Sequence, residues 1–119
     1  MTASATVMAD GAVVYSSITT ATIENDVRNG PCRVYELRVA NAGTAGYVKL
    51  WDSLAPVAGT TGPDYAFLVP ASSTIALVLG VAGEGVAFSV GLSVGASADA
   101  GTTHSTSPNA AMTVSLFTS

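Results

Sequence analysis

The stretch YVKLWD, residues 47–52, alternates along the chain but carries large side chains on both of its faces. If the stretch is a strand, its side chains point alternately to two sides. One face then carries Val48 and Leu50, and the other carries Tyr47, Lys49 and Trp51. A half-exposed sheet normally places its aromatic residues inside. We therefore expect a strand covered on both sides, with Val48 and Leu50 in the core.

Short apolar runs separated by turn residues extend from this stretch in both directions, which is typical of a sandwich or barrel. No run has the length and period of a substantial helix. We predict an all-β antiparallel sandwich, of jelly-roll or Greek-key type, with about seven or eight strands. The expected strands are AVVYSSIT (12–19), CRVYELRVAN (32–41), YVKLWD, YAFLV (65–69), TIALVL (74–79), VAFSVGLSVG (86–95) and AAMTVSLF (110–117).

Two details of this pattern carry further expectations. The strands at 32–41 and 47–52 are joined by the turn AGTAG and predict a hairpin. The strand at 86–95 has Phe88, Val90, Leu92 and Val94 on one face and only Ala, Ser and Gly on the other. Such a small face invites close approach by another backbone or another chain.

Two segments lack this alternation, at 20–31 and 96–109. We expect both to be irregular. The second is longer than most loops of compact domains, which makes it either functional or mobile.

Composition indicates one domain with little surface charge. The chain has 119 residues, of which 49% are hydrophobic and only 10% charged. Mean hydropathy is +0.49, but no apolar run approaches the roughly 20 residues of a spanning helix. We expect a soluble, unexported protein without a membrane partner. The domain is expected to occupy residues 12–119, and residues 1–11 are either an arm that reaches a neighbour or a flexible terminus.

The charge distribution argues against nucleic acid as a partner. The formal net charge is −4 and the pI is near 4.5, whereas phosphate binding needs clustered Lys or Arg. Arg33 and Arg38 are five residues apart and are expected on opposite faces of their strand.

No constellation in the sequence indicates an enzyme, and we expect no catalytic residues, cofactor or metal. His104 is the only histidine and lies in a polar segment, so it is expected to be solvated. Cys32, the only cysteine, is expected to be a small buried residue rather than a reactive thiol. Four carboxylates could gather around calcium, but nothing groups them in sequence, and solvated loop positions are favoured. These are Glu24, Asp26, Asp64 and Asp99.

Several motifs together resemble the small virion structural proteins of tailed bacteriophages. They are NAGTAGYVKLWD, the loop LAPVAGTTGPD, the run AFLVPAS and the stretch GVAFSVGLSVGASADAGTT, followed by a final β-run. The resemblance covers about residues 41–117. Trp51 and Ser53 depart from it, since the family more often has Tyr and Lys there, and so do Val94 and Gly95. The resemblance implies a β-sandwich on the virion, made in the host cytoplasm and placed on the capsid exterior.

The leading hypothesis is a capsid decoration or cement protein that binds the major capsid protein and itself, with a trimer suggested by the resemblance. Its expected contact surface is the second face of 47–52 together with the small-residue face of 86–95: Tyr47, Lys49, Trp51, Ser89, Gly91 and Ser93. In this hypothesis a neighbouring subunit covers Tyr47 and Trp51, and Lys49 reaches to the rim. The alternative is that the domain's own loops cover this face.

Two other functions fit the residues less directly. A tail-fibre or tail-tip module that binds a receptor or glycan could use Trp51 with Asp52, or Tyr65 with Asp64. A hydrolase of host surface polymers would need two carboxylates at a defined separation. The sequence permits that pair but does not indicate it.

Overall fold

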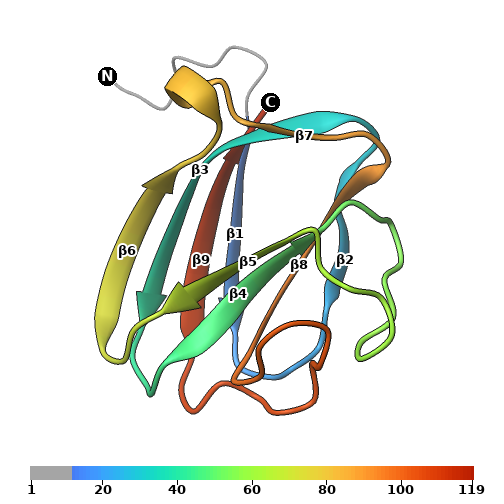
Figure 1. The fold of residues 1–119 in the computed structure, drawn as a ribbon. Coiled ribbons are helices and arrows are strands. Elements are labelled where there is room, and N and C mark those ends of the chain that lie inside the picture. Colours follow the sequence, from blue (N-terminus) through green and yellow to red (C-terminus); the bar gives the residue numbers. More distant parts are fainter. Residues whose placement is uncertain (1–11) are drawn as a thin grey trace.

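A computed structural model describes residues 12–119 as two antiparallel sheets packed face to face (Figure 1). The expectation of an all-β sandwich is confirmed. The helical part of these residues is a single 3-10 turn, η2 (Val81–Gly83). The expected N-terminal arm, residues 1–11, lies outside the described residues.

The sheets contain nine strands. Sheet A has the order β1 (Ala12–Ile18), β9 (Met112–Thr118), β3 (Cys32–Asn41) and β6 (Ser73–Val78), and β7 (Val86–Phe88) also pairs with β3. Sheet B has the order β2 (Glu24–Asn29), β8 (Gly91–Ser97), β4 (Gly46–Trp51) and β5 (Tyr65–Val69).

This strand order is that of a jelly roll. The chain forms four antiparallel pairs that nest inside one another: β1 with β9, β2 with β8, β3 with β6, and β4 with β5. Successive pairs alternate between the two sheets, as when one long hairpin wraps around a barrel. The short β7 is an addition between β6 and β8.

The core lies between the sheets and follows the alternation of the strands. In β9, Met112, Val114 and Leu116 are buried, as predicted, and across the core Val48 and Leu50 of β4 are fully buried. The inward side chains of neighbouring strands form rows across sheet A, because residues that are opposite in register point to the same face. One row runs through Val14, Leu116, Leu37 and Leu77.

The expected hairpin of 32–41 and 47–52 is wrong. β3 belongs to sheet A and β4 to sheet B, so the glycine-containing turn between them crosses the sandwich instead of joining paired strands. The buried Asn41 fixes this crossing: its amide nitrogen donates to the carbonyl oxygen of Thr44 at 2.8 Å, and its side-chain oxygen accepts from the Gly43 N–H at 3.0 Å.

The expected single strand 86–95 is also wrong. Its first part is β7 in sheet A, its last part lies within β8 in sheet B, and the chain changes sheet at Ser89 and Val90. Val90, expected inward with Phe88 and Leu92, is 52% exposed for this reason.

Asp52, at the end of β4, holds that change of sheet in place. One carboxylate oxygen accepts from the N–H and the hydroxyl of Ser89, at 3.0 and 3.1 Å, and the other accepts from the N–H of Val90 and of Gly91, at 2.8 and 3.2 Å. Partial burial raises the pKa of this carboxyl, but the donated hydrogen bonds outweigh that effect and hold the pKa below its ordinary value.

The structure differs from the sequence-based expectation at two more places, and each lies at a β-bulge. The segment 20–31, expected to be irregular, contains β2, which pairs with β8 across a register shift and includes Asp26 at a positive φ of 57°. In β3 the register shifts between Val34 and Glu36. A bulge inserts one residue and reverses the alternation beyond it. Arg33 and Arg38, expected on opposite faces, therefore both lie on the exposed side.

Replacing Asp52 tests the role of this carboxylate. In Asp52→Asn an N–H₂ group faces donors at one of the two oxygen positions, so we expect the free energy of unfolding to fall by about 1–2 kcal/mol. Urea unfolding followed by circular dichroism measures the change. The exposed Glu84→Gln is the matched control and is expected to leave stability unchanged.

Asp52→Asn and the wild type also test the pH dependence of stability. Because the folded pKa of Asp52 is depressed, its contribution is complete above the ordinary Asp pKa and is lost as pH falls through the lower folded value. Asp52→Asn should therefore lose less stability on acidification than the wild type. Equal acid sensitivity of the two proteins would contradict the assignment.

Candidate functional site

The six residues expected at an interface differ widely in burial. Lys49 and Ser93 are fully buried within the single chain, and Trp51 is 1% exposed. Gly91 is also buried, whereas Tyr47 is half-buried and Ser89 is exposed. The two faces of β4 are thus both covered, as the YVKLWD pattern predicts, but the chain itself supplies most of the second cover.

Two loops cover the centre of the outer face of sheet B. We call residues 98–111, which join β8 to β9, the strap; residues 52–64 join β4 to β5. The Trp51 indole N–H donates to the Thr61 carbonyl oxygen at 2.9 Å, and the indole ring meets the His104 ring edge-on with centroids 5.3 Å apart. Figure 1 shows the strap, in orange-red, at the end of sheet B where β8 finishes.

Lys49 ties β4 to the strap. Its ammonium group donates to the carbonyl oxygen of Thr103 at 2.6 Å, and its side chain is fully covered. Burial lowers the pKa of Lys49, and the nearby Asp99 carboxylate partly opposes that shift. The expectation that Lys49 reaches an interface rim is wrong, because its ammonium group ends under a loop of its own chain.

The small outer face of β8 is what allows the loops to approach. A Cβ atom placed on Gly95 would lie 3.0 Å from His104 Nε2 and 3.2 Å from the Trp51 ring, and one on Gly91 would lie 2.3 Å from a Leu54 methyl. Ser93 donates through its hydroxyl to the Ser53 carbonyl oxygen at 2.7 Å. The predicted close approach therefore occurs, and the approaching groups belong to the same chain.

These contacts correct the expectation that a neighbouring subunit covers Trp51. The physical reason is that the two loops already satisfy the indole N–H and the Lys49 ammonium group, leaving no open aromatic surface there. A subunit contact through Tyr47 and Ser89 stays a prediction.

The strap is ordered by its own hydrogen bonds. One carboxylate oxygen of Asp99 accepts from the N–H of Ser105 at 2.9 Å and of Thr106 at 2.7 Å, and the Ala98 N–H donates to the Thr106 carbonyl oxygen at 2.9 Å. The bonds from Thr106 and Ser105 hold the pKa of Asp99 below its ordinary value. The strap is thus a closed loop folded around a carboxylate.

The structure also decides the environments of His104 and Cys32. His104, expected to be solvated, is only 3% exposed, because the strap turns it inward over Gly95. Cys32 is buried, as predicted, and burial raises the pKa of its thiol.

The carboxylates considered for calcium are used separately. Glu24 accepts from the Ser16 hydroxyl, Asp26 from the Asn29 side chain, and Asp64 from the Asp52 N–H. Over residues 12–119, no three His, Cys, Asp or Glu side chains are placed so that they could hold a metal ion. In the same part of the chain, no helix has the length and apolarity needed to cross a membrane.

The outer face of sheet A, in contrast, is not covered by any loop of residues 12–119. We call its apolar part the open face: Val13, Tyr15, Ala76, Val78 and Phe117. Tyr15 and Val78 are 69% and 70% exposed. In the strand register, Val13 lies opposite Phe117, Phe117 lies opposite Glu36, and Glu36 lies opposite Val78. These four residues form one row across the sheet. Sequence reasoning missed this surface, although AVVYSSIT has apolar residues at successive positions and so on both faces.

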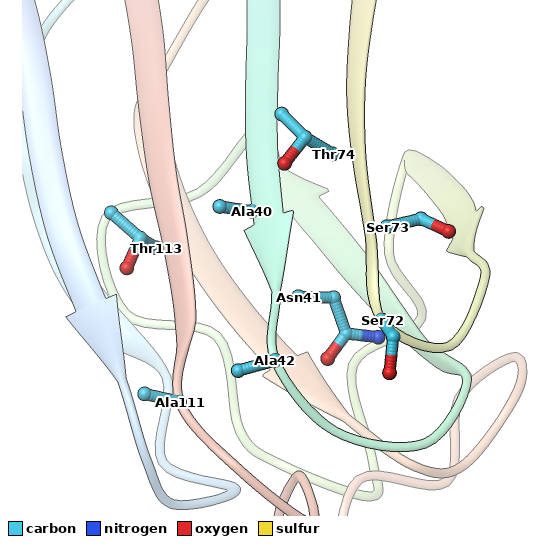
Figure 2. Close-up of a pocket in the computed structure, with 8 residues that line it drawn as sticks. All are labelled: Ala40, Asn41, Ala42, Ser72, Ser73, Thr74, Ala111 and Thr113. Atoms are coloured by element: carbon cyan, nitrogen blue, oxygen red, sulfur yellow. The ribbon is translucent and has the colours of Figure 1, made fainter.

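A shallow hollow of about 390 Å³ lies at the other end of the same sheet. Figure 2 shows its lining, with Ala40 and Thr113 side by side on β3 and β9 and Thr74 on β6. The hollow is lined by methyl groups, hydroxyls and one amide.

The fold and these surfaces define a jelly-roll β-sandwich with one sheet closed by loops and one sheet open. Scans of protein-family models, curated proteins and solved structures find no match to the chain.

Two Lys49 variants separate the role of its aliphatic stem from that of its charge. Lys49→Met keeps the stem and removes a buried ammonium group, so we expect a change in unfolding free energy within about 1 kcal/mol. Lys49→Ala leaves a cavity and should cost about 2–4 kcal/mol. Chemical unfolding measures both. Equal losses would mean that the bond to Thr103, and not the packing of the stem, dominates.

Proposed function

We propose that this chain is a virion structural protein of a tailed bacteriophage, a decoration or cement subunit that binds the assembled capsid. The sequence resemblance over about residues 41–117 supports the virion assignment. The jelly roll supports it at the level of fold, because this architecture occurs in viral capsid domains as well as in lectins and cupins.

The observation that carries the proposal is the open face. A sandwich normally covers its sheets with polar outward side chains, yet here Val13, Tyr15 and Val78 are at least half exposed on one sheet. Exposed apolar side chains on one sheet face, here on both sides of the Glu36–Arg38 pair, support an interaction site on that face.

The electrostatics of the open face suit association with a large protein surface. The charged pair at its centre, Glu36 and Arg38, is internally neutralised by an ion pair, and the Arg38 guanidinium lies 5.2 Å from the centroid of the Phe117 ring. Covering such a face removes little unpaired charge from water, and aromatic and Arg side chains are enriched at protein interfaces.

Self-association is the second part of the proposal. β1 is an edge strand of sheet A, and its sequence AVVYSSI has no charged residue and no proline, the usual protections of an open edge. A homo-oligomer formed beside this edge would extend the open face, and a trimer follows from the resemblance alone.

The proposed mechanism is thermodynamic. Each bound subunit adds interface across neighbouring copies of the major capsid protein, and a ligand that binds only the assembled shell shifts the equilibrium toward that shell. No step of this mechanism requires a cofactor or a catalytic group.

A receptor-binding or glycan-binding module on the tail is the second candidate. Its strongest aromatic, Trp51, is buried inside the chain. Tyr65, 36% exposed and stacked on Phe67, remains available for such a contact, next to Asp64.

The proposal is tested by mixing the purified protein with closed capsids assembled without it, from the phage that encodes it. We expect stoichiometric binding at symmetry-related sites in sedimentation and electron microscopy, with a higher melting temperature of the particle. Labelling of tails or host cells without binding to heads would instead support the receptor module.

Variants on the open face sharpen this test. Tyr15→Lys with Val78→Lys places two charges on the proposed contact, and we expect capsid affinity to fall by at least about tenfold, equivalent to roughly 1.4 kcal/mol. The matched control is Val57→Lys with Val90→Lys, two exposed loop valines outside the open face. If both double variants bind like the wild type, the open face is not the contact.

A further inference from the structure

His104 is buried in a way that the fold does not explain. Its side chain is 3% exposed, and neither Nδ1 nor Nε2 has a hydrogen-bond partner among the described residues. Buried polar atoms in folded proteins nearly always have partners. The surrounding strap has many hydrogen bonds, yet it places the protein's only histidine without one.

The groups around the imidazole favour its neutral form. β8 presents Gly95, and β4 presents the Trp51 ring edge-on and the Lys49 ammonium group. Lys49 donates to the carbonyl oxygen of Thr103, the residue directly before His104. A protonated imidazole would therefore bring a second cation into a covered space that already holds one.

The nearby carboxylate of Asp99 is already engaged. Asp99 lies in the strap, and its carboxylate accepts the N–H groups of Ser105 and Thr106, which hold the strap closed. Among residues 12–119, Lys49 and Asp99 are the charged groups that act on His104. A proton on the imidazole would have no free acceptor without rearrangement of the strap.

We propose that the strap is a pH-sensitive cover, which opens when His104 is protonated and exposes Trp51, Lys49 and the small-residue face of β8. The closed form holds the neutral imidazole against Trp51. In the open form the imidazolium, which can donate from both nitrogens, is solvated, and the two cations move apart. This inference does not rest on the proposed function.

The direction of the pH dependence follows from the same surroundings. Burial lowers the pKa of His104, Lys49 lowers it further, and Asp99 partly opposes both. The open form has a more ordinary pKa and binds the proton more readily. The closed form is therefore fully stable above the ordinary His pKa of about 6.5 and loses stability as pH falls below it. The ratio of closed to open form falls by up to about tenfold per pH unit.

Trp51 is the only tryptophan and lies directly against His104, so its fluorescence reports the opening. We would measure emission wavelength and acrylamide quenching from about pH 7.5 to about pH 5, where ordinary carboxylates stay ionised. Far-ultraviolet circular dichroism on the same samples reports the sheets. The expected result is a roughly threefold rise in the quenching constant at acid pH, with an unchanged sheet signal, because a covered indole becomes accessible.

Two variants assign the transition. His104→Gln cannot be protonated in this range and should abolish the pH dependence; His104→Leu serves if the glutamine variant does not fold. Lys49→Met removes the neighbouring cation, so the closed form accommodates the protonated imidazole better and the opening should become smaller or require a lower pH. A purely structural role of His104 would not produce that shift.

Three outcomes would overturn the proposal. The first is quenching of the wild type that does not change with pH. The second is a transition that persists in the His104 variants. The third is loss of the sheet signal together with Trp51 exposure, which would mean that the whole domain unfolds and not the strap alone.

Discussion

The structure depends on one constraint: β8 is buried on both of its faces along its whole length. Its inward residues Leu92, Val94 and Ala96 fill the core, as in any sandwich. Its outward positions are glycine or serine, so the two covering loops can pack directly against the strand. Asp52 sets the start of this strand by holding the change of sheet just before it.

This constraint makes the two outer faces of the sandwich unequal. The centre of sheet B is closed by the strap and the β4–β5 loop, which bury Trp51 together with two polar groups, Lys49 and His104. Sheet A keeps Tyr15 and Val78 in solvent. We assign the open face to contact with a partner, and the closed face to a cover that responds to pH.

Much of the fold could be predicted from local alternation. The core role of Val48 and Leu50 and the inward face of β9 follow from side-chain period alone. The bulge between Val34 and Glu36 could not be predicted, because one inserted residue reverses the alternation without a clear sequence signal. The chain's change of sheet at Ser89 was hidden for a similar reason: VAFSVGLSVG alternates evenly, and only the distant Asp52 divides it.

The candidate site was predicted in part. The large residues on both faces of YVKLWD and the small face of β8 correctly indicated covered surfaces, but alternation does not say whether the cover belongs to the same chain or to another. That information lies in tertiary contacts, such as the Trp51 N–H to the Thr61 carbonyl and His104 over Gly95. The open face could not be predicted from AVVYSSIT alone, because a strand with apolar residues on both faces does not reveal which face is the core.

The most direct test of this account is the accessibility of Trp51 at neutral pH as the free protein is diluted. If the chain's own loops cover the indole, its emission stays blue-shifted and its quenching by acrylamide stays weak at every concentration, including those at which the protein is monomeric. If Trp51 becomes accessible on dilution, a neighbouring subunit provides the cover, and the division into a self-closed sheet B and an open sheet A is wrong.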